Sequence, residues 1–266
     1  MGQNTSKTRS VIRVRQHRHQ QRPKVIQGLP EHKRDEEQGV IENGQQKPVL
    51  VSWSGGKDSC LALREMQQKP NIRIEALLTT VTREFDRISM PGVRRTMLER
   101  QAASLGLPLH QIFISKGAGN DEYESKMGEA FSGYRERGIN SVVFGDLFLE
   151  DIRAYRERLL ARHDMIGLYP VWKRDTADLI REFIRVGFKA VVVCVDPAQL
   201  DPSFTGRVID EEFLAQLPEH VDPCGENGEF HTFVFDGPNF KKPVRFSWGE
   251  IVCRDSFWFC DLVPEM

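Results

Sequence analysis

The sequence lacks any long apolar run. A transmembrane helix takes about 20 consecutive apolar residues, and no stretch of the 266 residues is both that long and that apolar. Hydrophobic residues make up 39% of the chain and charged residues 28%, the profile of a soluble globular protein. We therefore expect no membrane partner.

Cysteine is also scarce. The five cysteines are odd in number, no two have the C-x-x-C spacing, and no signal peptide precedes them. This pattern argues against a disulfide framework and favours a reduced, cytoplasmic setting.

Net charge is nearly absent, at -1, so the chain as a whole gives no electrostatic reason to expect a nucleic-acid partner. The charge is unevenly spread, because the first 47 residues hold ten Lys and Arg against five Asp and Glu. They are rich in Gln and poor in aromatic residues, which predicts a disordered basic tail over residues 1–46. The acid-free start is weakly reminiscent of a mitochondrial presequence, and Gly2 fits a bare myristoylation pattern.

The most informative stretch follows this tail. Residues 48–52 form a short apolar run that predicts a buried strand, and residues 61–66 are good helix formers. Between them lies Ser54-Gly55-Gly56-Lys57-Asp58-Ser59. The commoner phosphate loop needs a Gly six residues ahead of a Lys that Ser or Thr follows. Here Asp58 follows Lys57 and that upstream Gly is missing.

The strand, the two glycines and the helix nevertheless predict an anion cradle made of backbone N–H groups and the positive helix end. We expect Ser54, Asp58 and Ser59 to serve as helix caps. The competing interpretation is a glycine turn before an ordinary helix.

Strands and helices then alternate. Further strands are predicted over residues 73–81, 109–114 and 141–146, with helices over 92–105 and 121–136. This alternation predicts a parallel, doubly wound α/β sheet of the Rossmann-like class. Ligands bind beyond the carboxyl ends of the strands in such sheets. Thr79 and Asp146 are predicted to lie at such ends, so both are candidate nucleotide contacts.

Beyond Asp146 the pattern is less regular. Helices are predicted over residues 150–163, 175–185 and 210–217, and strands over 188–195, 229–235 and 244–252. We expect a nucleotide-binding domain over residues 47–147 and a smaller α+β substrate domain over 148–266.

A turn-rich segment, residues 222–228, leads into the strand at 229–235. Glu229 and His231 would share one face of that strand, close to Glu226 in the turn. Three interpretations compete: a substrate or acid–base pocket, a metal site that includes Cys224, and a solvated edge strand.

The six-residue loop resembles the pyrophosphate loop of N-type ATP pyrophosphatases, which cleave ATP between the α and β phosphates. Three more motifs follow it in order: Gly145-Asp146, Gly206-Arg207 and Gly228-Glu229-Phe230-His231-Thr232. Together they resemble the diphthamide synthase (diphthine–ammonia ligase) family over about residues 48–250. That resemblance implies an adenine-nucleotide α-hydrolase-like Rossmann domain that binds ATP, and an enzyme that adenylates a carboxylate and then lets ammonia or another amine displace AMP.

The resemblance also implies roles for particular residues. Residues 54–59 would hold the pyrophosphate, with Lys57 adding charge or facing solvent. Asp58 would take part in catalysis and, with Asp146, hold Mg²⁺; helix capping and ribose binding are the alternatives. Glu229 and His231 would act on the acceptor or the amine. Arg207 and Glu226 would bind the acceptor.

One position departs from the family pattern. Eukaryotic and archaeal members carry Glu where this chain has His231, and the version found here resembles a bacterial branch. The resemblance therefore carries over the ATP chemistry better than the acceptor. Two other function classes stay open: an RNA-modifying enzyme of the thiolase type, which usually needs paired cysteines, and a nucleotide-binding protein without catalysis.

Overall fold

The computed structural model describes residues 46–89 and 91–265. The predictions for the tail fall on residues outside this range, except for Gln46, whose Nε2 donates to the Pro70 carbonyl at 2.9 Å. No helix in the described part of the chain is long and apolar enough to cross a membrane.

The larger sheet holds six strands in the order β3-β2-β1-β5-β6, with β4 also paired to β2. Every pairing is parallel except the one between β2 and β3. The strands are β1 (Lys47–Ser52), β2 (Ile72–Thr82), β3 (Arg87–Ile88), β4 (Leu109–Ile114), β5 (Ser141–Val143) and β6 (Ile166–Leu168). The chain runs outward from β1 through β2 to β4 and then returns to β5 on the other side. The carboxyl ends of β1 and β5 therefore form the topological switch point.

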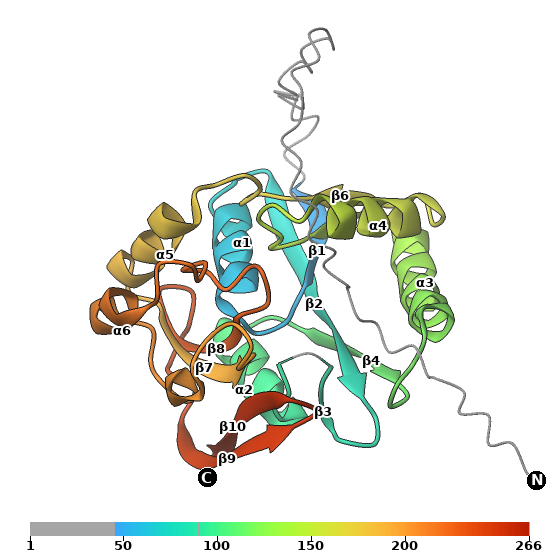
Figure 1. Ribbon diagram of the computed structural model, residues 1–266. Helices are drawn as coiled ribbons and strands as arrows, with labels where there is room; N and C mark the ends of the chain where they lie inside the picture. The colour runs from blue at the N-terminus through green and yellow to red at the C-terminus, as the bar shows by residue number, and fades with distance from the viewer. Residues whose placement is uncertain (1–45, 90, 266) are drawn as a thin grey trace, which may run out of the picture.

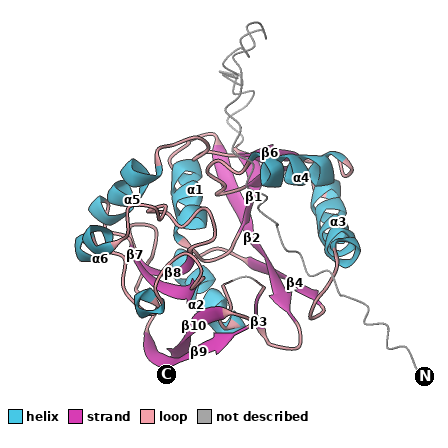
Figure 2. Cartoon of the chain, in the orientation of Figure 1, coloured by secondary structure: helices cyan, strands magenta, loops and turns pink. Residues whose placement is uncertain are grey.

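Both faces of this sheet are covered (Figures 1 and 2). Residues of α3 (Asn120–Glu136) and α4 (Glu150–Ala161) share one apolar cluster with Leu50 of β1. Residues of α1 (Lys57–Gln67) and α2 (Arg95–Leu105) share the other cluster with Val49 and Val51. The alternation along β1 sends successive side chains to opposite faces, as in a strand buried on both sides.

A second, smaller sheet is antiparallel, in the order β8-β7-β10-β9. Its strands are β7 (Lys189–Val195), β8 (Phe230–Asp236), β9 (Phe246–Arg254) and β10 (Phe257–Pro264). The remaining helical elements are α5 (Thr176–Arg185), α6 (Glu211–Gln216) and the 3-10 turn η1 (Pro202–Phe204). Apolar residues of this sheet belong to the same cluster as those of α1 and α2, so the two sheets share one core.

The predicted fold class is confirmed: a parallel α/β sheet is joined to a smaller α+β part. Two features differ from the prediction. The parallel sheet continues past residue 147, because β6 pairs with β5. The helix caps are also not the predicted ones, as described below.

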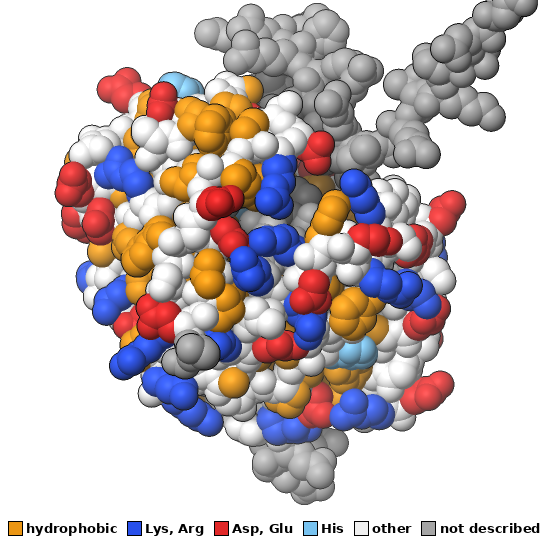
Figure 3. Space-filling view, turned by 90° about the horizontal axis from the view of Figure 1, so that it is seen from below, with side chains coloured by type: hydrophobic (Ala, Val, Ile, Leu, Met, Phe, Trp, Pro, Cys, Tyr) orange, Lys and Arg blue, Asp and Glu red, His pale blue; other side chains and the backbone are white. Residues whose placement is uncertain are grey.

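The surface that carries β9, β10 and the chain end can be seen from below in Figure 3. Lys and Arg side chains are interspersed there with Asp and Glu, and no broad patch of one sign is visible. That face lacks the positive stripe expected of a nucleic-acid-binding surface.

Candidate active site

The loop after β1 leads directly into α1. The residue before the helix is Gly56, and no side chain caps the helix within the loop itself. The predicted caps Ser54, Asp58 and Ser59 are therefore wrong. Ser54 Oγ instead accepts from the Gly56 N–H at 3.2 Å, and Ser59 Oγ donates to the Gly56 carbonyl at 2.9 Å. These two hydroxyls brace the loop internally.

The cap comes from a distant strand. Lys57 N–H, the first of α1, donates to Thr232 Oγ1 of β8 at 3.1 Å. Val234 N–H of the same strand donates to the Gly55 carbonyl at 2.9 Å. These two hydrogen bonds thus join strand β8 to the start of α1 and the loop before it.

A buried glutamine of α2 holds this junction together. Gln101 Nε2 donates to the carbonyls of Gly55 and Val234, at 3.0 and 2.6 Å, and its Oε1 accepts from Trp53 Nε1 at 2.8 Å. All of these groups are out of water, where an unpaired polar group would be costly. Loop, helix and strand are therefore fixed relative to one another.

Close backbone approach explains the glycines. Gly55 has φ +78°, a conformation that favours glycine. A Cβ on Gly56 would lie 3.1 Å from the Thr232 carbonyl oxygen, and one on Gly145 would lie 2.6 Å from the Asp58 carbonyl carbon. Gly145 therefore lets the carboxyl end of β5 contact the first turn of α1.

The loop keeps some N–H groups free. Those of Gly56 and Lys57 are taken by Ser54 and Thr232, but those of Gly55 and Ser59 have no acceptor among the described residues. Together with the positive end of α1 they can receive an anion. The N–H groups of Gly56 and Lys57 are therefore not available to that anion.

Lys57 is buried, so it does not face solvent. Its side chain is 4% exposed, and its Nζ lies 2.9 Å from Asp58 Oδ2. Burial disfavours the charge, but attraction by the Asp58 carboxylate outweighs it and raises the Lys57 pKa. Lys57 is therefore a fixed positive charge at the start of α1.

Asp146 lies on the other side of the switch point. Its carboxylate pairs with Arg156 of α4, with Oδ2 2.8 Å from Nε and Oδ1 3.1 Å from Nη2. The Arg156 guanidinium in turn lies 4.5 Å from the centre of the Phe144 ring. Asp146 is thus engaged by a cation of the protein itself.

Residues 222–229 form a loop over this region, and Glu229 organises it. Only 2% of Glu229 is exposed, and its carboxylate accepts from the backbone N–H groups of Asp222 and Asn227 at 3.0 and 2.9 Å. Glu226 of the same loop accepts from Leu147 N–H at 3.0 Å. The loop therefore joins the start of β8 to the end of β5. Burial on this scale does not fit a solvated edge strand.

Two titratable side chains of this site have strongly shifted pKa values. Burial, with the Asp58 charge, raises the pKa of Glu226 to about 7. Burial, with the Lys57 charge, lowers the pKa of His231 to about 4. At neutral pH His231 is therefore uncharged, and Glu226 is close to its midpoint. Shifts of this kind cluster at functional sites.

The structure brings most of the predicted residues to this one edge, but not all of them. Thr79 is buried within β2, which runs on to Thr82, and pairs in register with Gln111. Arg207 donates to Gln216 at 2.7 Å and lies over Phe204 and Phe213. Arg207 is connected to the other site residues only indirectly, because Phe213 packs edge-on against Phe230 of β8.

The metal interpretation of Cys224, Glu226, Glu229 and His231 is not supported. Among the described residues, no group of three or more His, Cys, Asp or Glu side chains could hold a metal ion. One atom does fit a cation: Asp58 Oδ1 is buried and has no hydrogen-bond partner. Mg²⁺ is commonly held by one or two carboxylates plus substrate phosphates.

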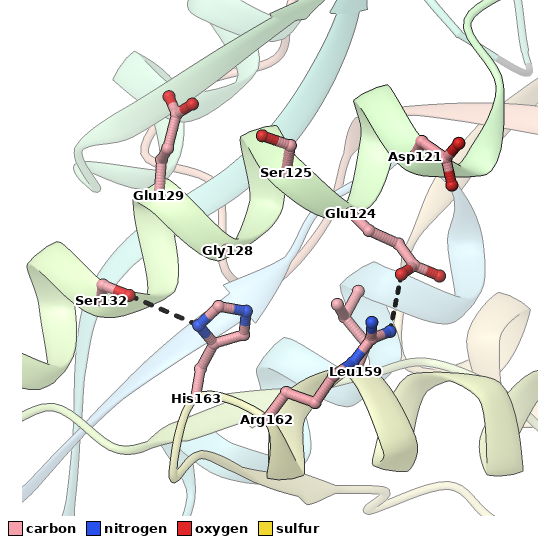
Figure 4. Close-up of a pocket in the computed structure, with 9 residues that line it drawn as sticks. All are labelled: Asp121, Glu124, Ser125, Gly128, Glu129, Ser132, Leu159, Arg162 and His163. Carbon is pink, nitrogen blue, oxygen red and sulfur yellow. Dashed lines mark hydrogen bonds and ion pairs between the residues drawn. The ribbon is translucent and has the colours of Figure 1, made fainter.

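A separate groove lies away from these residues. It is an open groove of about 630 Å³ between α3 and α4 (Figure 4). Glu124 pairs there with Arg162, and Ser132 Oγ lies 3.4 Å from the His163 Nδ1 atom. No predicted site residue lines it.

Sequence reasoning missed three residues of this site: Trp53, Gln101 and Arg156. Gln101 and Arg156 lie in helices that were predicted, but nothing in a single sequence indicates which polar helical residue turns inward. Thr232 was noticed only as part of a motif, and its role as a cap depends on a contact across 175 positions.

Two family models match the chain. The one described as the diphthamide synthase N-terminal domain matches residues 47–166, and the one described as the C-terminal domain matches residues 175–262. A diphthine–ammonia ligase of Homo sapiens is 28% identical over 232 residues, covering 78% of this chain and 86% of the relative. One of Mus musculus is 29% identical over 231 residues, with the same coverage. One of Danio rerio is 28% identical over 225 residues, covering 77% and 88%.

Proposed function

The chain belongs to the diphthamide synthase family, and from this premise we propose that it is an ATP-dependent ligase that converts a carboxylate into an amide. The relatives named above are diphthine–ammonia ligases. One observation carries the proposal: Thr232 of β8 contacts the phosphate-type loop at Lys57, and the charges of Lys57 and Asp58 act on Glu226 of the loop over residues 222–229.

The reaction has two steps. A carboxylate oxygen of the acceptor attacks the α-phosphorus of ATP, the bond to the β-phosphate breaks, and pyrophosphate leaves. Ammonia then attacks the carbonyl carbon of the acyl-adenylate, the bond to AMP breaks, and the nitrogen loses a proton. Both steps develop negative charge at phosphate oxygens, which preorganised donors stabilise strongly.

The residues of the site suit these steps. The free N–H groups of Gly55 and Ser59 would hold the departing pyrophosphate, with Lys57 as the nearby fixed charge. Ser54, whose hydroxyl contacts Ser59 Oγ at 3.2 Å, would keep that turn in shape. Asp58 would contribute Oδ1 to Mg²⁺, which neutralises phosphate charge when bound. Asp146 would help to bind Mg²⁺ only if its ion pair with Arg156 were broken.

The acceptor half of the site is proposed to lie under the loop over residues 222–229. Glu229 would act as a positioning residue, since its carboxylate is occupied by the loop backbone. Glu226, close to half-ionised at neutral pH, and His231, which is uncharged, would accept protons from the incoming amine. Thr79 would border the nucleotide from β2. Arg207 would support the acceptor pocket through Phe213.

The nucleotide products test this proposal. We expect the protein, given ATP, Mg²⁺, ammonium and a small-molecule extract, to release AMP and pyrophosphate in ³¹P NMR spectra. Asp58→Asn should reduce that release by roughly a hundredfold or more, as expected for loss of a charged transition-state contact. Asp255→Asn is the matched control, because Asp255 is exposed in a turn at φ +48° that Asn tolerates. ADP and phosphate as products would refute the proposal.

A further inference from the structure

Strand β9 forms a free edge of the smaller sheet, at the bottom of the molecule in Figure 1. It pairs with β10 on one side, and no backbone hydrogen bond joins the other side of residues 247–254 to any described residue. The opposite edge strand, β8, is covered. There Val234 N–H donates to the Gly55 carbonyl, and the Val234 carbonyl accepts from Gln101. The two edges of this sheet therefore differ, and β9 is the open one.

The length and composition of β9 make this edge unusual. β9 has nine residues, whereas strands average about five or six, and exposed edge strands are usually short. Trp248 is 56% exposed and Ile251 is 49% exposed. Both side chains lie on one face of the sheet, because a Cβ on Gly206 would lie 3.7 and 3.6 Å from them. A long edge strand with exposed apolar side chains is a template for pairing with another strand.

The other face of β9 carries one acid and one base. Three residues of β9 line one pocket beside Asp261 of β10, and so share that face: Glu250, Val252 and Arg254. Glu250 and Arg254 are exposed, and neither has an ion-pair partner among the described residues. The nearby Arg94 does not pair with Glu250, because it is bound to Asp261. Two opposite charges thus lie four positions apart, with Val252 midway between them.

We propose that β9 pairs with β9 of a second copy of this chain, antiparallel about a two-fold axis through Val252. In that register Glu250 of each copy lies opposite the partner's Arg254, so two ion pairs form. On the other face Ile251 lies opposite the partner's Cys253. Opposite charges that face each other across antiparallel strands stabilise the pair, and like charges weaken it. The strand is therefore complementary to itself, as a two-fold interface requires.

The oligomeric state of the full chain tests this inference without ATP, so the result is independent of the proposed function. Size-exclusion chromatography with light scattering would measure molecular mass against protein concentration. Five residues a side make a small interface, so we expect a dimer with a Kd of roughly 10–100 µM.

Charge reversal tests the ion pairs. Glu250→Arg and Arg254→Glu should each raise the Kd of the dimer by roughly tenfold or more, because each change brings like charges together at two places. The double variant, with both changes, restores opposite charges and should dimerise as the parent protein does. Glu219→Arg makes the same change of charge at an exposed position outside β9, and should have no effect.

A cysteine on the two-fold axis tests the register. Cys253 is the exposed cysteine among the described residues, so Cys253→Ser removes it. Val252→Cys in that background places two cysteines directly opposite each other, within the Cα separation that a disulfide requires. Mild oxidation should then give a covalent dimer. The parent protein should not give one, because its two Cys253 residues would lie about 8 Å apart.

Three results would overturn the inference: a monomer at concentrations far above the expected range, a dimer that both charge reversals leave intact, or a double variant that fails to recover dimerisation. Hydrogen exchange would then identify what covers the edge. Protected β9 amides in a monomer would show that another segment of the chain, such as residues 1–45, pairs with β9 instead.

Discussion

At the scale of single residues, the site depends on close packing of backbone against backbone. Gly145 is a clear case, because a methyl group there would meet the Asp58 backbone at 2.6–2.7 Å. Backbone cannot rotate away as a side chain can, so the contact forces β5 and α1 apart.

We therefore expect Gly145→Ala to lower the free energy of unfolding by roughly 1–3 kcal/mol and to weaken ATP binding. Urea denaturation and nucleotide titration measure the two effects. Gly133→Ala is the matched control: it is an exposed position within α3, where an added Cβ meets nothing within 4 Å. That change should be neutral or stabilise the helix. Equal stability of the two variants would show that the approach of β5 to α1 is not tight.

The two shifted pKa values predict opposite effects of pH on stability. His231 takes up a proton near pH 6.5 when unfolded but only near pH 4 when folded. Between these values the unfolded state binds more protons, so His231 lowers stability as pH falls. Glu226 loses its proton near pH 4.5 when unfolded but near pH 7 when folded. Here the folded state binds more protons, so Glu226 lowers stability as pH rises.

Single variants separate these effects. Relative to the parent protein, His231→Gln should gain stability as pH falls from about 6.5 to 4.5, and Glu226→Gln should gain stability as pH rises from about 4.5 to 7. Melting temperatures across that range measure both trends. His220→Gln, an exposed histidine, should track the parent protein throughout. Parallel pH profiles for all three variants would contradict the buried environment assigned to His231 and Glu226.

At the scale of elements, the central feature is that β8 caps α1. Thr232→Val preserves shape but removes the oxygen that accepts from Lys57 N–H. We expect a loss of about 1 kcal/mol, as for other helix caps, and a weaker hold on ATP because the loop is less fixed.

Thr205→Val is a close control for that experiment. Thr205 is as buried as Thr232, at 4% exposed, but its hydroxyl has no hydrogen-bond partner among the described residues. Removing an unpaired buried hydroxyl should cost nothing or stabilise the fold. Chemical denaturation of both variants decides the matter, and a similar loss in the two would mean that the contact between Thr232 and Lys57 contributes nothing of its own.

The elements were predictable where the local pattern decides them. The strand at residues 109–114 has the predicted bounds, and α2 ends at Gly106, which adopts φ +71°. Three strands were missed, the shortest being the two-residue β3. The three residues of β6 are too few for a pattern, and β10 alternates too weakly to stand out, since its burial depends on β7 and β9. The caps of α1 were mistaken because the local Ser and Asp compete with a distant Thr, which only the fold brings close.

For the whole molecule, chain order and spatial order differ in a way that creates the site. Residues 54–59, Gly145 with Asp146, and residues 222–231 are far apart in sequence, yet they meet where β1 and β5 diverge. The motifs were predictable from sequence, but the contacts that unite them were not. Arg207 was grouped with them by resemblance, whereas its partners are Gln216 and two aromatic rings.

The structure also bears on the alternative function, an RNA-modifying enzyme. It needs a reactive thiol near the loop, and Cys60 is the cysteine that follows it. That side chain is buried in α1, and burial raises its pKa well above the ordinary value. A thiol held in this protonated form is a poor nucleophile, so the structure favours the ligase.

The central claim is that one site couples cleavage of ATP to amide formation. The protein would be incubated with ATP, Mg²⁺, ¹⁵N-ammonium and a small-molecule extract, and the products followed by mass spectrometry. We predict a new ¹⁵N-labelled amide that forms in equal amount with AMP and only when ATP is present. Formation of ADP, or AMP release with no ¹⁵N entering any carbonyl product, would contradict the account.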